Sequence, residues 1–284
     1  MPVDCHIHML LDGVFYRDAI AAHQDGPRED LIRSRLAWYA QLGFTYLRDG
    51  GDRWGVCLRA RALAADYGVV YRCPVFPIYK RGRYGGLIGR GYDTIAEYRA
   101  LVREVRLQGG DFIKIMIAGL MDFHQFGVLT CEPLPRQEIR ELISIAHQEG
   151  FPVMAHANGG DTVLYAAEAG VDSVEHGAYL HPEALAAMAA AGTVWVPTLA
   201  TIGNLRGTGR YPEGELGRIL DAAMEAVSRF AALGGLVAPG SDAGAYAVPH
   251  GQGGLDEYAL LRQALVPQAD AMLAQGAAAI QARF

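Results

Sequence analysis

Short runs of β-branched and aromatic residues alternate with longer amphipathic stretches along the whole chain. A short apolar run bounded by turn residues is typical of a buried strand, whereas apolar positions that recur every three to four residues indicate a helix. The alternation occurs eight times, and the predicted strands lie at 3–8, 45–48, 69–77, 112–117, 152–156, 173–176, 193–197 and 236–239.

The amphipathic stretches between these runs predict helices at 28–41, 94–107, 135–149 and 182–191. Several of the helical patterns are followed by a glycine, which favours the left-handed conformation just past a helix end; these glycines are Gly43, Gly150, Gly170 and Gly192. Strands that alternate with helices predict parallel pairing with right-handed crossovers.

Eight strand–helix units favour closure into a (β/α)8 TIM barrel over an open doubly wound sheet. No Gly-x-Gly-x-x-Gly motif follows the first strand, so nothing indicates a dinucleotide fold. No linker or shift in composition divides the chain, and we expect residues 1–284 to form one domain. Two connections, 80–92 and 119–134, are unusually long and are expected to form lids or substrate walls.

Composition narrows the class of protein only modestly. The chain has 284 residues, of which 51% are hydrophobic and 20% charged, as in ordinary globular enzymes. Its net charge of −6 argues against nucleic acid or an anionic membrane as the main partner. No apolar run reaches the roughly 18 residues of a membrane span. The first predicted strand begins at residue 3, which leaves no room for a signal peptide, so we expect a cytoplasmic protein with reduced cysteines.

The strongest chemical signal is His6-Ile7-His8 in the first predicted strand. Residues two apart on a strand point to the same side, so the two imidazoles could bind one metal ion. A His-x-His pattern alone is weak, because histidines also occur in cores with a backbone partner.

Further candidate ligands fall near the carboxyl ends of other predicted strands. Lys114 lies in the fourth strand, His156 ends the fifth, His176 ends the sixth, and Asp242 follows the eighth. Barrel enzymes place their chemistry at this face. A backbone-bonded core histidine would explain any one of these residues, but it does not explain the same placement on five strands.

The order His-x-His, Lys, His, His, Asp resembles the amidohydrolase superfamily. Three stretches are similar to the branch that holds imidazolonepropionase-like enzymes and metal-dependent Xaa-Pro dipeptidases and carboxypeptidases; they are Val-Met-Ala-His-Ala-Asn at 153–158, Val-Asp-Ser-Val-Glu-His-Gly at 171–177 and Pro-Gly-Ser-Asp-Ala-Gly at 239–244. The resemblance covers nearly the whole chain. It departs from the family in one respect, since the usual flanking β-sandwich domain is expected to be absent.

The resemblance implies a site of two divalent ions, expected to be zinc, with Lys114 as a carbamate that bridges them. A desolvated lysine has a lowered pKa, so its neutral amine is available to react with carbon dioxide. His6 and His8 would bind one ion together with Asp242. His156 and His176 would bind the other.

These expectations predict hydrolysis of a C–N amide bond in an N-acyl amino acid, a dipeptide or a cyclic amide. A bridging hydroxide between the ions would attack, and Asp242 would take its proton and deliver it to the leaving nitrogen. A mononuclear deaminase, a lactonase or phosphotriesterase, and a catalytically silent assembly subunit remain alternatives, although Lys114 argues against the first. We expect a small-molecule substrate, no nucleic-acid or membrane partner, and a homo-oligomer.

Three further residues are candidate substrate contacts. His250 lies in the loop after the eighth strand, Tyr179 lies three residues past His176, and Arg83 belongs to a basic loop after the third strand. Each also has an ordinary interpretation: a loop histidine, a packing tyrosine and a solvated arginine.

Overall fold

The strands of the computed structural model, which describes residues 1–284, form two sheets in which every neighbouring pair is parallel. The smaller sheet has the order β1 (Val3–Ile7), β2 (Tyr46–Asp49) and β3 (Val70–Arg72). The larger sheet has the order β10-β9-β8-β7-β6-β4-β5, and its strands are β4 (Pro77–Lys80), β5 (Arg90–Tyr92), β6 (Ile113–Met116), β7 (Val153–Ala157), β8 (Ser173–His176), β9 (Val194–Val196) and β10 (Leu236–Val237).

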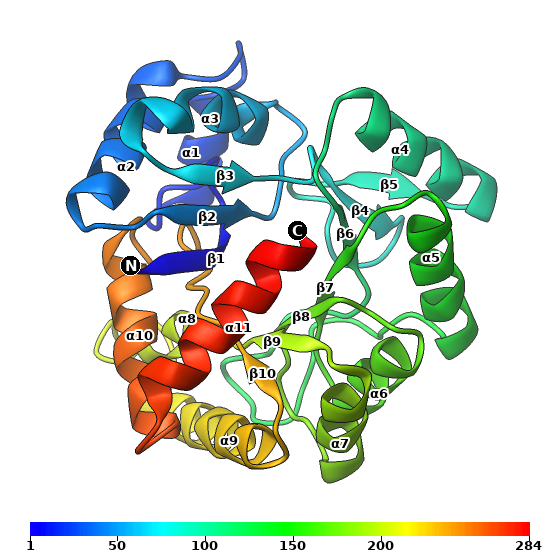
Figure 1. The fold of residues 1–284 in the computed structure, drawn as a ribbon, viewed down its shortest axis with the longest axis vertical. Helices are drawn as coiled ribbons and strands as arrows, with labels where there is room; N and C mark the ends of the chain where they lie inside the picture. Colours follow the sequence, from blue (N-terminus) through cyan, green and yellow to red (C-terminus); the bar gives the residue numbers. More distant parts are fainter.

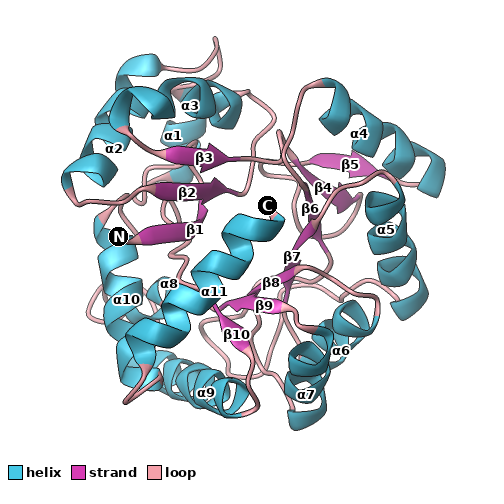
Figure 2. Cartoon of the chain, viewed as in Figure 1, coloured by secondary structure: helices cyan, strands magenta, loops and turns pink.

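Helices surround the strands on the outside (Figure 2). They are α1 (Tyr16–Ala21), α2 (Glu29–Gln41), α3 (Val56–Ala64) with the 3-10 turn Ala65–Tyr67, α4 (Ile95–Leu107), α5 (Arg136–Gln148), α6 (Gly160–Glu168), α7 (Pro182–Ala191), α8 (Ala200–Gly203), α9 (Glu213–Ala232), α10 (Gln252–Ala264) and α11 (Ala269–Arg283). Helix α11 differs from the rest because it runs across the strands toward the centre of the view (Figure 1). No helix in the molecule combines the length and apolar character that crossing a bilayer requires.

The predicted parallel α/β pattern is confirmed, with one strand divided. The predicted strand 69–77 is two strands, because β3 pairs with β2 whereas β4 pairs with β6. Between them Pro74 has no N–H to donate, and Val75 has a φ of 69°, so the backbone turns out of the first ladder. The short strand β5 pairs with β4 at the end of the long connection 80–92, where no strand was predicted.

Closure of the sheets into a barrel stays a prediction, because no continuous ladder joins the two sheets. Strand β1 meets the segment after β10 through a hydrogen bond from the Cys5 N–H to the Pro239 carbonyl, 2.9 Å long, and through a bridge between Ile7 and Ala243. At the other boundary, β3 and β4 are linked by the chain itself.

Apolar side chains fill the interior near the amino ends of the strands, and the polar candidate residues lie near the carboxyl ends. A cluster of eleven buried residues comprises Val3, Cys5, Tyr46, Phe112, Met154, Val194, Val196, Ala238, Ala277, Ile280 and Phe284. Phe112 lies two residues before Lys114, and Met154 lies two residues before His156, so each pair shares one strand face. Since α11 and the terminal residue after it supply the last three members, this end of the chain covers the amino ends of the strands and leaves their carboxyl ends to the site.

Candidate active site

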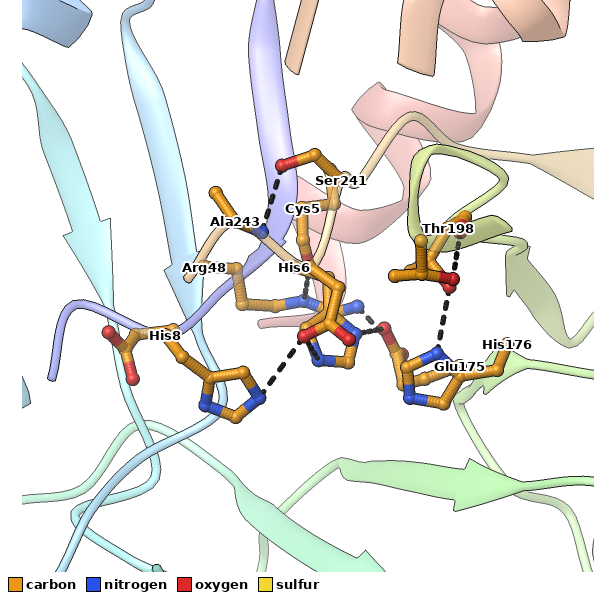
Figure 3. Close-up of polar contacts among 12 residues, drawn as sticks. Cys5, His6, His8, Arg48, Glu175, His176, Thr198, Ser241 and Ala243 are labelled. Carbon is orange, nitrogen blue, oxygen red and sulfur yellow. Dashed lines mark hydrogen bonds and ion pairs between the residues drawn. The ribbon is translucent and has the colours of Figure 1, made fainter. Parts of the chain in front are cut away.

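Four histidines and an aspartate from the strand ends converge in the structure. The ring centroids of His6 and His8 lie 5.4 Å apart, those of His6 and His176 5.1 Å, and those of His156 and His176 4.6 Å. The ligand atoms of His6, His8 and Asp242 all lie within 4.8 Å of one another. Figure 3 shows His6, His8 and His176 with their imidazoles close together. The predicted convergence therefore exists in the fold.

A buried carboxylate fixes the protonation of His6. The Nδ1 of His6 lies 2.7 Å from Oε2 of Glu175, and neither side chain is exposed. Arg48 donates to the other carboxylate oxygen at 2.8 Å (Figure 3). The Ser173 hydroxyl donates to that oxygen at 2.6 Å. Because the charged carboxylate is an acceptor, His6 carries its proton on Nδ1 and presents the lone pair of Nε2 to the site.

His176 and His156 also have one ring nitrogen hydrogen-bonded to a neighbouring residue, which leaves the other nitrogen free. Nδ1 of His176 lies 2.8 Å from the hydroxyl of Thr198, which leaves Nε2 free. Nε2 of His156 lies 3.2 Å from the carbonyl oxygen of Gly119 and donates to it, which leaves Nδ1 free. The Gly119 carbonyl can only accept and so selects the His156 tautomer, whereas the Thr198 hydroxyl, which can donate or accept, orients the His176 ring.

Several polar atoms at the centre are buried without a hydrogen-bond partner: His6 Nε2, His8 Nδ1, Lys114 Nζ and Asp242 Oδ1. The Asp242 oxygen lies only 3.4 Å from His6 Nε2 and 3.3 Å from His8 Nε2. With the His6 proton on Nδ1, the Nε2 lone pair faces a carboxylate oxygen. Two hydrogen-bond acceptors this close repel each other unless a proton or a cation lies between them. Imidazole nitrogens and carboxylate oxygens are the donor set that divalent zinc binds, so the residues fit such an ion.

Burial dominates the electrostatics of this centre. It lowers the pKa of His8 and of His156 to about 3, and the charge of Lys114 acts in the same direction. Burial also lowers the pKa of Lys114 to about 8, against the opposing charges of Glu175 and Asp242. It raises the pKa of Asp242 to about 7, with Lys114 opposing the shift. The histidines are thus held neutral, as ligands must be.

Backbone strain and two glycines shape the strand ends. His176 and Asp242 have φ values of 68° and 59°, in the left-handed region that non-glycine residues rarely adopt. A Cβ on Gly240 would lie 2.4 Å from Val196 and 2.8 Å from the His6 backbone nitrogen. A Cβ on Gly50 would lie 2.4 Å from the His8 ring. Only glycine allows these close approaches.

Comparison with known proteins gives relatives in sequence and in structure. No family model matches the chain. Ochratoxinase from Aspergillus niger is 25% identical over 281 residues, which cover 84% of this chain and 56% of that protein. An uncharacterized protein of Mycobacterium tuberculosis is 34% identical over 118 residues, which cover 40% of this chain and 31% of that protein. The chain thus spans little more than half the length of the ochratoxinase it matches.

Solved structures extend the likeness to the whole chain. A Xaa-Pro dipeptidase with methionine bound in its active site superposes with a TM-score of 0.79 at 22% identity, over 99% of this chain and 75% of that one. Aspergillus niger ochratoxinase superposes with a TM-score of 0.74 at 21% identity, over 98% of this chain and 71% of that one. The chain has the fold of the amidohydrolase superfamily.

A cavity opens above the converging histidines and Asp242. It has a volume of about 300 Å³, and His8, His176 and Asp242 belong to its lining. Both long connections contribute walls, as the sequence predicted: 80–92 supplies Tyr84, Gly85, Leu87 and Ile88, and 119–134 supplies Leu120, Met121 and Phe123. The Tyr84 ring lies 4.8 Å from the His156 ring, and burial raises the pKa of its hydroxyl.

The three predicted substrate contacts lie outside the lining of this cavity. Nε2 of His250 is 2.8 Å from the Leu11 carbonyl, and the side chain is buried. The ring of Tyr179 packs against Phe126 at 5.1 Å and lines a different cavity. Arg83 lies 3.5 Å from Glu132 at the surface. A role for these residues with substrate stays a prediction.

Sequence reasoning missed the residues that surround and orient the ligands, namely Arg48, Glu175, Thr198 and Tyr84. One signal was available: Glu175 is an acidic residue inside a strand buried along almost its whole length, and buried carboxylates need partners.

Proposed function

We propose that this chain is a metal-dependent hydrolase of carbon–nitrogen amide bonds. The observation that carries the proposal is the unpartnered cluster at the cavity base, where His6 Nε2 presents its lone pair toward Asp242 Oδ1 at 3.4 Å. A divalent cation relieves that arrangement and uses both atoms as ligands. The proteins of similar fold, named as a dipeptidase and an ochratoxinase, support an amide as the bond that is cleaved.

In this proposal His6, His8 and Asp242 hold one ion, His156 and His176 hold a second, and carbamylated Lys114 is shared. Zinc suits the imidazole-rich donor set. When bound, two such ions polarise a substrate carbonyl and lower the pKa of water. The lowered pKa of Lys114 supports the carbamate, because a neutral amine is the form that reacts with carbon dioxide.

The protein groups have separate tasks. Asp242 belongs to the cavity lining, and with its Oδ1 used as a ligand its other carboxylate oxygen, Oδ2, can accept a proton from water and deliver it to the leaving nitrogen. Glu175 keeps His6 in the required tautomer, and Thr198 holds the His176 ring in place through Nδ1. The connections 80–92 and 119–134 wall the cavity above the site, and water excluded by these walls would strengthen its electrostatic interactions. The interior cluster capped by α11 supports a companion proposal, that the strands close into an eight-stranded barrel.

The test measures metal content and substrate class together. Purified protein should contain close to two divalent ions per chain and should hydrolyse members of a panel of N-acyl amino acids and dipeptides. Asp242→Asn serves as the matched inactive control. Metal-replete protein that cleaves lactones or phosphotriesters but no amide would assign it to the other hydrolases. Turnover of amidines with one ion per chain would indicate a deaminase, and no turnover with both ions bound would indicate a silent subunit.

A further inference from the structure

The cavity above the ligand residues combines a polar base with aromatic walls. Fifteen of its 23 lining residues are hydrophobic. Six of the lining residues carry a phenyl or phenol ring: Phe15, Tyr16, Tyr84, Phe123, Tyr211 and Tyr246. A volume of about 300 Å³ is that of a site for a small organic ligand. A group with large apolar surface therefore fits these walls better than a small polar one.

The mouth of the cavity is apolar as well. Val14 is 68% exposed and Phe15 53%, and both line the cavity together with the exposed side chains of Leu87 and Leu120. Exposed large apolar side chains gathered around one opening indicate a binding surface. Because these residues also belong to the lining, the surface is continuous with the site below.

Arg210 is the one lysine or arginine in the lining, and Asp242 is its one carboxylate. The Arg210 guanidinium carbon lies 4.3 Å from the Tyr246 ring centroid and 5.5 Å from that of Tyr211. It forms no salt bridge in the structure, whereas nearby Arg206 lies 3.8 Å from Glu213. A guanidinium held by ring stacking keeps its hydrogen-bond donors free for a ligand.

The rings beside Arg210 are themselves held in place. The Tyr211 ring lies 5.2 Å from the Phe123 ring and 5.0 Å from the His124 ring, so the loop after α8 packs against the loop after β6. Arg210 itself is exposed, and the packing of its neighbour Tyr211 places it at the rim of an apolar cavity in a chain of net charge −6. The acidic residues that follow it in the sequence, Glu213 and Glu215, pair with Arg206 and Arg218 instead.

We infer that Arg210 is a specificity-determining residue that binds a substrate carboxylate, and that the preferred substrates are amides of amino acids with a bulky aromatic acyl group or side chain. The planar fork of a guanidinium matches the two oxygens of a carboxylate. The aromatic part packs against the cavity rings, with the amide carbonyl toward Asp242. The scissile amide rests on the proposed function; the preference for an anionic, aromatic ligand rests on Arg210 and the cavity alone.

The test compares two amides that differ only in the carboxylate, N-benzoyl-L-phenylalanine and N-(2-phenylethyl)benzamide. The unaltered protein should prefer the acid in kcat/KM, and higher salt should shrink that preference. Arg210→Gln should lower kcat/KM for the acid by about 10-fold, the size of one hydrogen-bonded charge pair, and leave the neutral amide unchanged. Arg206→Gln, four residues earlier and paired with Glu213, is the matched control and should change neither value.

A binding measurement separates this inference from the proposed function. N-benzenesulfonyl-L-phenylalanine carries the same acid and rings but no carboxamide to hydrolyse, and its binding is followed by calorimetry. If the protein binds this probe in an Arg210-dependent way yet cleaves no amide, the proposed function fails, and the preference for an anionic, aromatic ligand bound by Arg210 stands. If amides are cleaved but Arg210→Gln changes neither the acid preference nor probe binding, the inference is overturned alone. Equal losses for both amides, or no probe binding at all, also overturn it.

Discussion

Replacing Glu175 with Gln tests whether the strand-end histidines are prepared as metal ligands. In the structure one Glu175 oxygen accepts from His6 Nδ1 at 2.7 Å, and the other accepts from Arg48 at 2.8 Å and from Ser173 at 2.6 Å. A glutamine has one acceptor oxygen and one NH2 donor. With its oxygen kept by Arg48, the amide turns its NH2 toward His6, which must then accept at Nδ1 and carry its proton on Nε2.

That change of tautomer removes the lone pair that the site requires. Loss of an outer partner of a metal-binding histidine costs roughly 10–100-fold in metal affinity. Because Arg48 is fully buried, removing the charge of its partner also destabilises the fold, and breaking a buried pair typically costs about 3–5 kcal/mol. We expect Glu175→Gln to weaken zinc binding by about 10–100-fold and to lower the free energy of unfolding.

Zinc affinity is measured by competition with a chromogenic chelator, and stability by urea unfolding of the same samples. Ser173→Ala is the matched control, because it removes one hydrogen bond to Glu175 but leaves the carboxylate charge and the His6 contact. It should keep the zinc affinity of the parent protein within a few-fold, since the His6 contact persists. Unchanged zinc affinity in a folded Glu175→Gln protein would refute the tautomer argument.

Four further changes probe the site and its surroundings. Lys114→Ala should lower bound metal from two ions toward one and remove most activity, with partial recovery in short carboxylic acids; full activity with both ions would make the lysine structural. Asp242→Asn should reduce kcat by about 10²–10⁴-fold while metal content, read by mass spectrometry, changes less, and a near-normal kcat would assign proton transfer to another group. Gly50→Ala should displace the His8 ring, which a Cβ would approach to 2.4 Å, and lower zinc affinity at unchanged helix content by circular dichroism; equal affinity would show that the ring tolerates the added methyl group. Burial raises the pKa of Glu257 from 4.5 to about 8, so the folded state keeps a proton that the unfolded state loses, and the parent protein loses stability as pH rises between those values. Glu257→Gln should flatten the decline of the unfolding free energy with pH, measured by urea unfolding; parallel curves for the two proteins would count against this assignment.

The strand pattern and the placement of the candidate ligands at the strand ends were accessible from the sequence because both are local properties. Lys114 and His156 lie on strands whose alternate residues join the core, so their face follows from the period of two. The division between β3 and β4 was not accessible, because it depends on the backbone of Val75, whose φ of 69° no composition rule indicates. The strand β5 was hidden for a related reason, since its residues Arg90–Tyr92 lack the apolar run that marks a buried strand.

The hydrogen-bond partners of the candidate ligands could not be predicted, because they come from strands that are far apart in the sequence. Arg48 on β2 reaches Glu175 on β8, 127 residues away and in the other sheet, so the contact depends on how the two sheets lie together. Nearness in sequence was an unreliable guide for the same reason. His250 follows Asp242 by eight residues, yet the intervening chain turns through the left-handed φ of Ala247, and the imidazole meets the Leu11 carbonyl instead of the cavity.

The choice between two arginines shows what the structure adds to chemical pattern. Arg83 was the candidate because it belongs to a visibly basic loop, but its guanidinium lies 3.5 Å from Glu132, and it is absent from the cavity lining. Arg210 stands in a segment without a basic pattern, yet it is the cation that lines the cavity and has no carboxylate partner. A sequence records which residues are charged, whereas binding depends on which charges the fold leaves unpaired. The same criterion selects His6 Nε2 and Asp242 Oδ1 at the base of the cavity, so both ends of the proposed substrate site are defined by groups whose partners must come from outside the chain.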